Sequence, residues 1–548
     1  MNVAKNPILK GFNPDPSIVR VGDDYYIATS TFEWFPGVQI HHSPDLVNWT
    51  LITRPLNDLN KLNMKGVPDS CGVWAPCLSY HDGLFYLVYS NVKSFSGVWK
   101  DTPNYLITAN EILGEWSDPI FLSSSGFDGS LFHDGNGQKW YLSMLLDHRN
   151  SKMFGGVILQ EYDSETQKLI GPVHHIFKGS SLGLTEGPHL YKKDGYYYLI
   201  TAEGGTEYGH AATMARSKTI NGPYEISPNH PFISSRDDRD YYLQKSGHGD
   251  LVQTKNGDWI AVFLTARPIS PRGLCILGRE TSIETVIWPK GEWPALAIGS
   301  NVPRLEVPIS DAKPVAAPVP MQSRDDFNET QLPLNYQSLR VPITEDWASL
   351  TKRPGYLTLT GRESLSSTHE QSLIARRIQS LKMEASLSLD FDPTSFLQMA
   401  GLVLYYNTAH FHYLHVTVNP EGQRCLQIIT HDHFEQFEAY KTPLILPQNG
   451  PIFLKAQLNG ADLQFYYAVG NDVWIKAGNK LNAGILSDDY VREGGTRYRP
   501  AFTGAFVGLC AQDLTGNKTP AYFDWFNYEE EEYQFTLAST EPYKMEQS

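Results

Sequence analysis

The first half of the chain repeats one pattern of polar and apolar positions five times. In each repeat a turn dipeptide precedes an apolar, aromatic-rich run; the dipeptides are Gly22-Asp23, Asp82-Gly83, Asn136-Gly137, Asp194-Gly195 and Asn256-Gly257. Such dipeptides suit the left-handed backbone of tight β-hairpins. The aromatic markers Tyr25, Phe85, Trp140, Tyr197 and Trp259 are 60, 55, 57 and 62 residues apart. Because each unit is long enough for four strands, the pattern predicts a five-bladed β-propeller.

A functional side chain recurs about ten to twelve residues before each marker, in a short segment that leads into the hairpin. These residues are Asp15, Trp74, Asp128, Glu186 and His248. Taken singly, each would more often be a turn former or a core residue. The innermost strands of a propeller line its axis, so we expect equivalent positions to meet at one mouth of the channel. Three carboxylates held together there repel one another, which favours a functional site over a scaffold.

The second half of the chain predicts a separate β-sandwich. Residues 311–324 are rich in Pro and Ala and predict an extended linker between a first domain (1–310) and a second (325–540). Beyond the linker, short segments alternate apolar and polar residues, as in Tyr356–Thr360, Ala385–Phe391 and Phe453–Leu458. Alternation with turn residues between the segments is typical of an antiparallel sandwich, so the whole chain is expected to be all-β.

Composition narrows the class of protein further. The net charge of −15 argues against nucleic acid or an anionic membrane as a partner. We expect no transmembrane helix and no signal peptide, and the five scattered cysteines are typical of reduced thiols in a cytoplasmic protein. Aromatic residues make up 12% of the chain, and aromatic rings pack on sugars as well as in β-sheet cores.

Two other motifs are interpreted as structural. Gly179-Ser180-Ser181-Leu182-Gly183 matches the nucleophile motif G-x-S-x-G but lacks the flanking strand and helix, so a loop is the better interpretation. His410, His412 and His415 suggest zinc, but in a strand the first two face one way and the third the other. We therefore expect surface or packing roles for these histidines, and no protein metal site.

Clustered carboxyls of this kind are typical of enzymes that hydrolyse glycosidic bonds. One carboxylic acid protonates the leaving oxygen, while an ionised partner activates water or attacks carbon. A third carboxylate can raise the pKa of the acid by like-charge repulsion. Chemistry alone does not distribute these roles among Asp15, Asp128 and Glu186.

The residues around these positions resemble those of glycoside hydrolase family 43 β-xylosidases. The similarity spans nearly the whole chain and includes Asn13-Pro14-Asp15-Pro16-Ser17, Trp74-Ala75-Pro76, Phe127-Asp128-Gly129-Ser130, Thr185-Glu186-Gly187-Pro188-His189, Gly278-Arg279-Glu280 and Gly504-Ala505-Phe506-Val507-Gly508. The resemblance implies a five-bladed propeller followed by a lectin-like, concanavalin A-like sandwich, and hydrolysis with inversion.

Residue roles follow from the resemblance alone. It implies Asp15 as general base, Glu186 as general acid, and Asp128 as the residue that tunes the acid and orients the sugar. It also implies that Arg279 binds the non-reducing xylose, that His248 lies beside the base, and that Phe32 and Trp74 form walls. Phe506 matches a stretch of the sandwich that closes the pocket, so that only a chain end fits.

Two residues depart from the family pattern. Gly129 stands where Pro or Ala is frequent, which implies some loss of rigidity. Leu146 lies where related chains often carry a Trp on the leaving-group side, which puts the affinity for the second sugar in doubt.

The leading hypothesis is an exo-acting enzyme that releases xylose from xylobiose and β-1,4-xylo-oligosaccharides. The alternatives are an α-L-arabinofuranosidase on the same scaffold, a non-catalytic sugar-binding protein, and a propeller for protein partners. No cofactor is required by the mechanism, although the resemblance allows a divalent cation such as Ca²⁺ near His248. It also implies a homo-oligomer, either a dimer or a tetramer.

Overall fold

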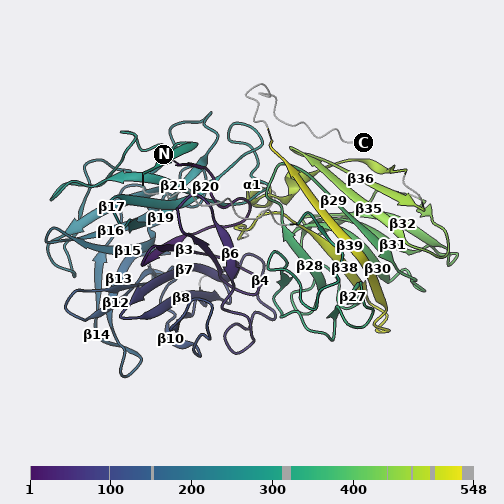
Figure 1. Cartoon of the computed structure of the whole chain (residues 1–548), viewed down its shortest axis with the longest axis horizontal. Coiled ribbons are helices and arrows are strands. Elements are labelled where there is room, and N and C mark those ends of the chain that lie inside the picture. Colours follow the sequence, from purple (N-terminus) through teal and green to yellow (C-terminus); the bar gives the residue numbers. More distant parts are fainter. Residues whose placement is uncertain are drawn as a thin grey trace.

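The computed structural model describes residues 2–97, 99–149, 153–310, 322–440, 442–470, 473–493 and 500–533. These residues form two β-rich parts that lie side by side along the long axis of the molecule (Figure 1). The all-β class predicted from the sequence is confirmed. Residues 311–321 of the predicted linker and 534–540 of the predicted second domain lie outside the described residues, so the domain bounds stay a prediction.

The first part consists of five four-stranded antiparallel sheets, and this confirms the predicted five blades. The first blade contains β2 (Ser17–Val21), β3 (Asp24–Thr29), β5 (Gln39–Ser43) and β6 (Thr50–Thr53). The second contains β7 (Gly72–His81), β8 (Leu84–Val92), β9 (Asn104–Ala109) and β10 (Ile120–Ser123). The third contains β11 (Ser130–His133), β12 (Lys139–Leu146), β13 (Phe154–Asp163) and β14 (Lys168–Phe177). The fourth contains β15 (Glu186–Lys193), β16 (Tyr196–Glu203), β17 (Ala211–Ser217) and β18 (Glu225–Ile226). The fifth contains β19 (Gln244–Gln253), β20 (Trp259–Ala266), β21 (Glu280–Ile287) and β22 (Ala295–Leu296).

The turn dipeptides connect the first two strands of each blade, as predicted. In the second blade Asp82 and Gly83 have φ values of 50° and 80°, and in the fourth Asp194 and Gly195 have 50° and 79°. Left-handed backbone at both central positions is the type I′ geometry that matches strand twist. The first strands of the blades pack against one another around the axis, so equivalent repeat positions converge.

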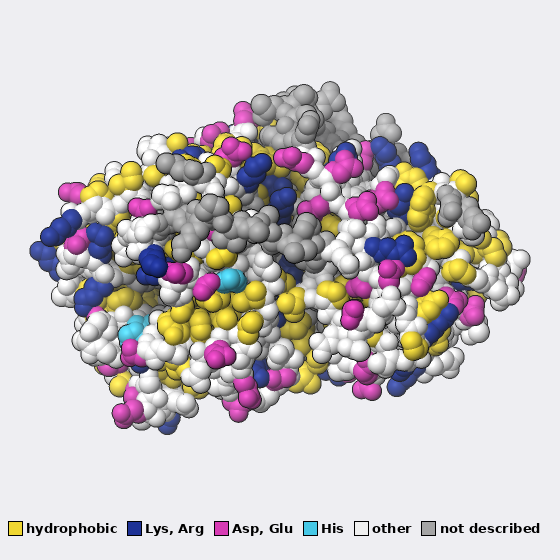
Figure 2. Space-filling view, in the orientation of Figure 1, with side chains coloured by type: hydrophobic (Ala, Val, Ile, Leu, Met, Phe, Trp, Pro, Cys, Tyr) yellow, Lys and Arg dark blue, Asp and Glu magenta, His cyan; other side chains and the backbone are white. Residues whose placement is uncertain are grey.

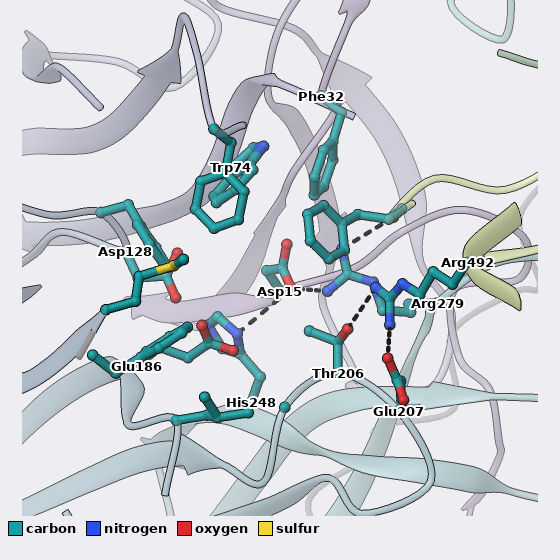
Figure 3. A pocket seen from close by; sticks show the side chains of 17 residues that line it. Asp15, Phe32, Trp74, Asp128, Glu186, Thr206, Glu207, His248, Arg279 and Arg492 are labelled. Carbon is teal, nitrogen blue, oxygen red and sulfur yellow. Dashed lines mark hydrogen bonds and ion pairs between the residues drawn. The ribbon is translucent and has the colours of Figure 1, made fainter. Parts of the chain in front are cut away.

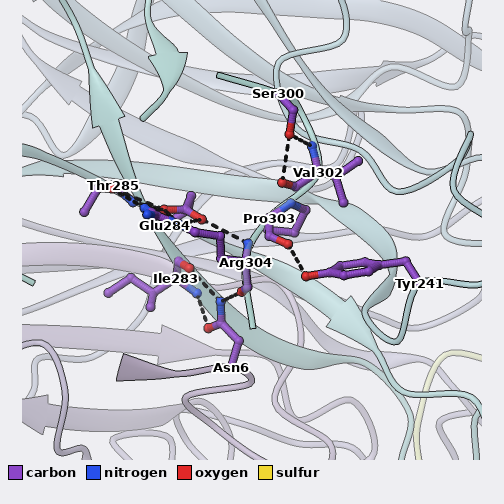
Figure 4. Close-up of polar contacts among 9 residues, drawn as sticks. All are labelled: Asn6, Tyr241, Ile283, Glu284, Thr285, Ser300, Val302, Pro303 and Arg304. Atoms are coloured by element: carbon purple, nitrogen blue, oxygen red, sulfur yellow. Dashed lines mark hydrogen bonds and ion pairs between the residues drawn. The ribbon is translucent and has the colours of Figure 1, made fainter. Parts of the chain in front are cut away.

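In the described part of the chain, each blade consists of strands that follow one another in the sequence, so no blade joins the first and last strands of the propeller. The ring is closed instead by side-chain contacts and by a short pair of strands. Strand β1 (Asn2–Lys5) pairs with β23 (Glu306–Ile309). Asn6 then reaches the fifth blade: its amide exchanges two 2.8 Å hydrogen bonds with the backbone of Ile283 and donates a third to Arg304 O (Figure 4). Arg304 in turn pairs with the buried carboxylate of Glu284. The start and the end of the propeller are therefore tied together.

The second part is an antiparallel sandwich of two large sheets, as predicted. One sheet contains β24 (Arg324–Asp325), β26 (Ala348–Ser349), β27 (Leu357–Thr360), β29 (Lys382–Asp390), β35 (Ile452–Asn459), β36 (Asp462–Val469), β37 (Ile475–Asn482) and β39 (Pro520–Glu531). The other contains β28 (Ser372–Arg377), β30 (Gln398–Asn407), β31 (His410–Val418), β32 (Arg424–Asp432), β33 (Glu435–Glu438), β34 (Leu444–Ile445) and β38 (Phe506–Asp513). A 3₁₀ turn, η2 (Ala483–Leu486), and a one-and-a-half-turn helix, α1 (Asp488–Glu493), interrupt the strands; the sequence pattern did not predict the helix.

The two parts share one apolar core. Strand β4 (Trp34–Phe35) of the propeller pairs with β25 (Ser338–Leu339) of the second part. Arg340, whose side chain is fully buried, donates from Nε to Val67 O at 2.6 Å and pairs with Asp69 at 2.8 Å. One cluster of buried side chains runs through both parts, from Phe12 and Trp34 to Tyr405 and Phe506. The second part is thus packed as a fixed cap on the propeller.

The surface carries charges of both signs, and the cysteines form no disulfides. Acidic and basic side chains are interspersed across the face seen in Figure 2. All five cysteines are free and buried. Within the part of the chain that the structure describes, no helix is long and apolar enough to cross a membrane.

Candidate active site

A cavity of about 290 Å³ lies where the innermost strands of the propeller meet the second part (Figure 3). The structure brings seven of the eight predicted site residues together in its lining; these are Asp15, Phe32, Trp74, Asp128, Glu186, His248 and Arg279. The size is at the lower end of the range of about 300–1,000 Å³ for small-molecule sites. The convergence inferred from the repeat is therefore real.

Backbone conformation turns several of these side chains toward the axis. Asp15, Asp128 and His248 have positive φ values of 54°, 55° and 36°. Such left-handed conformations cost about 1–3 kcal/mol each for residues other than glycine and concentrate at functional sites. At Gly187 (φ 56°) an added Cβ would lie 2.8 Å from the His248 ring, so glycine is required beside Glu186.

Asp15 is held as an ionised carboxylate. Its Oδ1 accepts a 2.8 Å hydrogen bond from Arg279 Nη1 and lies 3.5 Å from His248 Nδ1, while Ser30 Oγ donates to Oδ2 at 2.7 Å. Burial raises the pKa of Asp15, but Arg279, His248 and the Ser30 hydrogen bond outweigh it and lower the pKa below its ordinary 3.8. Asp15 is therefore ready to accept a proton at neutral pH.

Glu186 and Asp128 are held in the opposite state. Burial, followed by repulsion from Asp15, raises the pKa of Glu186 to about 8. Burial, followed by repulsion from Glu186 and Asp15, raises the pKa of Asp128 well above its usual range, although Gly187 N donates to its Oδ2 at 3.1 Å. One ionised and two protonated carboxyls thus face one cavity, an arrangement that can accept and donate a proton in the same reaction.

Arg279 connects the propeller to the cap. Its Nη2 donates to Phe502 O at 3.0 Å, and its guanidinium lies 5.4 Å from the ring centre of Phe32 and 5.8 Å from that of Phe502. Its Nε is buried and has no hydrogen-bond partner among the described residues. Arg279 itself lines the cavity, so its guanidinium lies within the site.

Six of the seventeen residues that line the cavity are aromatic. Trp74 is fixed by a 3.0 Å hydrogen bond from its Nε1 to Ser70 O, and its ring lies 4.9–5.8 Å from four other rings. Those rings belong to Phe32, Phe95, Phe127 and Phe502, all of which line the cavity.

The placement expected for Phe506 is wrong. Phe506 is fully buried behind the wall, where its ring stacks on Trp34 with 3.7 Å between centroids. Phe502, four residues earlier, lines the cavity instead. Phe506 is the first residue of β38, whose backbone pairs with β28 and β30, so its side chain enters the core between sheet and propeller.

Arg492 is one of two charged lining residues, with Glu207, that sequence reasoning missed. It lies on α1, donates from Nη2 to Thr206 Oγ1 at 3.0 Å and to Ala501 O at 2.7 Å, and pairs with Glu207. Its positive charge lowers the pKa of Glu186 against the effect of burial. Arg492 belongs to no repeat, and a six-residue helix leaves no periodic pattern, so no sequence signal pointed to it.

The two departures from the family pattern have structural counterparts. An added Cβ at Gly129 would lie 2.9 Å from the Tyr141 ring and 3.0 Å from Val88, so packing of these neighbours favours glycine there. Leu146 pairs across the strands with Phe154, and Phe154 lines the cavity. An aromatic ring is therefore present on this side, contributed by the neighbouring strand.

The surroundings of His248 do not make up a calcium coordination set. Ca²⁺ takes about 6–8 oxygen ligands, whereas the nearby carboxylate of Asp15 is already paired with Arg279. Within the described part of the chain, three potential metal ligands gather closely only at His410, Asp432 and His433, none of which lines the cavity.

The fold and the site together define the protein as a glycosidase. The axis of its propeller ends in a cavity that is lined by aromatic rings and covered by the second part, and the carboxyls in this cavity have pKa values shifted in opposite directions. Residues 4–294 match Glycosyl hydrolases family 43, and residues 324–529 match the Beta xylosidase C-terminal Concanavalin A-like domain. The chain belongs to glycoside hydrolase family 43.

Two relatives and one solved structure match over nearly their full length. The chain is 48% identical to the Beta-xylosidase of Bacillus subtilis (strain 168), with 96% of this chain and 99% of that protein covered. It is also 48% identical to the Xylosidase/arabinosidase 43B of Humicola insolens, covering 96% and 98%. The crystal structure of xylan beta-1,4-xylosidase from Bacillus Halodurans C-125 superposes with a TM-score of 0.93 at 50% identity, covering 96% of this chain and 100% of that one.

Proposed function

We propose that the protein is an exo-acting β-xylosidase that releases xylose from the non-reducing end of xylobiose and β-1,4-xylo-oligosaccharides with inversion of configuration. The observation that carries the proposal is the set of three buried carboxyls with opposed pKa shifts in one aromatic cavity. The names of the Bacillus relatives support the choice of xylose as the released sugar.

The mechanism assigns one role to each carboxyl. Asp15, ionised by its contact with Arg279, removes a proton from a water molecule as the water attacks the anomeric carbon. Glu186, with a pKa of about 8, gives its proton to the departing glycosidic oxygen. After each turnover Asp15 is protonated and Glu186 is ionised, so proton exchange with solvent restores the starting state. Burial and repulsion from the ionised Asp15 keep Glu186 protonated, and Asp128, itself protonated, donates a hydrogen bond to a sugar hydroxyl.

The remaining lining residues hold the sugar. Arg279 offers its guanidinium to a xylose hydroxyl, while Phe32 and Trp74 pack against the ring. His248, beside Asp15, orients the base. Arg492 and Phe502 from the second part close the cavity, so a chain end enters and an internal xylose unit does not.

A second candidate is α-L-arabinofuranosidase activity in the same cavity. It is favoured by the relative from Humicola insolens, whose name covers both activities. Parallel assays with the nitrophenyl β-xyloside and α-L-arabinofuranoside separate the two. We expect faster xyloside turnover; faster arabinoside turnover would make arabinofuranosidase the main activity.

The proposal is tested by the anomer of xylose released from xylobiose, followed by proton NMR in the first minutes. Release of α-xylose supports inversion, with a water molecule between Asp15 and the sugar. Release of β-xylose means retention, in which case one carboxylate is a nucleophile and the roles must be reassigned.

The setting of the enzyme belongs to the same proposal. We expect activity without an added cofactor, a cytoplasmic location consistent with five free thiols, and a homo-oligomer, dimer or tetramer. Light scattering after size-exclusion chromatography measures the oligomeric state, and activity after chelation tests the need for a metal.

A further inference from the structure

A second cluster of ligand-bearing side chains lies in the sandwich, outside the cavity lining. His410 begins β31, Asp432 ends β32 directly opposite it, and His433 follows in the turn to β33. One potential ligand atom from each of these residues lies within 4.8 Å of the others. Adjacent strand ends therefore bring together two imidazoles and a carboxylate.

The carboxylate of Asp432 is at the centre of the cluster. Its Oδ1 lies 3.8 Å from His410 Nε2 and 2.6 Å from His433 Nδ1, and its Oδ2 accepts a 2.8 Å hydrogen bond from the Tyr490 hydroxyl. The His410 side chain is fully buried, whereas those of Asp432 and His433 are 22% and 20% exposed. One side of the cluster is therefore open to water.

The orientation of His410 suits a metal ligand. Its Nδ1–H donates to Asn407 Oδ1 at 2.9 Å, and the same oxygen accepts from Ala409 N at 2.9 Å, which fixes the amide orientation. A neutral His410 then carries its lone pair on Nε2, the atom that faces Asp432. Histidines that bind metals usually anchor the other ring nitrogen in this way.

The cluster differs from the one suggested by the sequence. His412 uses both ring nitrogens, at 2.9 Å from Thr430 Oγ1 and 3.0 Å from Asn482 O, and His415 Nδ1 lies 3.3 Å from Tyr413 O. Among the described residues, only His410 of the three faces other potential ligands. The structural expectation for His412 and His415 is consistent with these contacts.

We propose that His410, Asp432 and His433 bind one divalent transition-metal ion, of the Zn²⁺ type, with water completing the coordination. Two imidazole nitrogens and one carboxylate oxygen are typical zinc ligands, whereas Ca²⁺ and Mg²⁺ prefer oxygen alone. Because Asp432 also holds Tyr490 of α1, the ion fixes the end of the β31–β32 hairpin against the helix that carries Arg492.

The test uses the full-length protein, stripped with a chelator and titrated with Zn²⁺ by calorimetry and with Co²⁺ by visible absorption. We expect one ion per chain, the intense bands of tetrahedral Co²⁺, and a higher apparent Tm with Zn²⁺ but not with Ca²⁺. His433→Asn, which tolerates the left-handed backbone at that position (φ 51°), and Asp432→Asn each weaken binding by more than about 100-fold. His369→Ala, at an exposed histidine elsewhere in the sandwich, is the matched control and binds as the wild type does.

Three outcomes would overturn the proposal. The first is wild-type protein that binds neither ion, and the second is undiminished binding by His433→Asn and Asp432→Asn. The third is a cobalt spectrum that disappears in His248→Ala but persists in His433→Asn, which would place the ion in the propeller channel.

Discussion

At the scale of single residues, neighbours rather than residue type decide the protonation of the three carboxyls. Asp15 and Asp128 are chemically identical and both buried, yet their pKa values shift in opposite directions. Asp15 has a guanidinium and a hydroxyl donor, whereas Asp128 has two carboxyl neighbours and one backbone donor. Burial penalises both charges, and at Asp15 the penalty is outweighed by Arg279, His248 and the Ser30 hydrogen bond together.

Loss of the acid should depend on the leaving group. Glu186→Ala is expected to lower kcat/KM on xylobiose by about 10²–10⁴-fold, because general acid catalysis contributes that much. Nitrophenyl xylosides with activated leaving groups need less proton donation and should lose less. Steady-state kinetics over a series of aryl xylosides measures the difference, and an equal loss across the series would remove Glu186 from this role.

The pH profile of kcat/KM should be bell-shaped, because one carboxyl must be ionised and another must be protonated. Asp15 must be ionised, so activity falls as pH drops through its lowered pKa, below 3.8. Glu186 must be protonated, so activity falls as pH rises through about 8.

Arg492 provides a test of the basic limb. Its charge lowers the pKa of Glu186, so Arg492→Met should move the basic limb of kcat/KM to higher pH, while Arg492→Lys keeps the charge and leaves the limb close to its place. A limb at the same pH in Arg492→Met would contradict this electrostatic contribution.

At the scale of elements, position on a strand decides whether a side chain reaches the cavity. Phe506 lies at the start of β38 and enters the shared core, whereas Phe502 precedes the strand and lines the cavity. The family-like stretch was identified correctly from the sequence, but the ring that closes the cavity was not.

The two phenylalanines should therefore behave differently on truncation. Phe506→Ala is expected to destabilise the protein by about 3–5 kcal/mol through an internal cavity, with modest kinetic change in the folded fraction. Phe502→Ala should lower the apparent Tm less than Phe506→Ala, because one side of Phe502 faces the cavity, and should lower kcat/KM by about 10- to 100-fold through loss of apolar contact. Thermal unfolding and xylobiose kinetics on both variants check this; the reverse pattern would restore Phe506 to the pocket.

At the scale of the whole molecule, the second part completes the active site rather than adding a separate module. It contributes Arg492 and Phe502 to the cavity, accepts a hydrogen bond from Arg279, and shares a core with the propeller. Strand β4 of the propeller pairs with β25 of the cap, which further joins them.

A chain cut after residue 310 should therefore lose activity and solubility. The propeller alone would expose Phe12, Trp34 and Phe35, which are buried in the complete protein. We expect aggregation on size-exclusion chromatography and no measurable xylose release, compared with the full chain prepared in parallel. A soluble and active fragment would show that the cap is dispensable.

The sequence by itself determined the repeat and everything that follows from it. The hairpin dipeptides set the registers of the blades, and a fixed register converts one repeat position into one place in space. This is why Asp15, Trp74, Asp128, Glu186 and His248 could be grouped before the structure was known, and the structure places all five in one cavity.

Only the tertiary structure decided the contacts made across repeats and across the two parts. The pKa directions depend on which buried charges face each other, and Arg279, Asp15 and Arg492 come from distant segments. Phe502 rather than Phe506 lines the cavity, and the potential metal ligands beside His410 are Asp432 and His433 rather than His412 and His415. Such contacts depend on long-range packing, which leaves no period in the sequence because each occurs once.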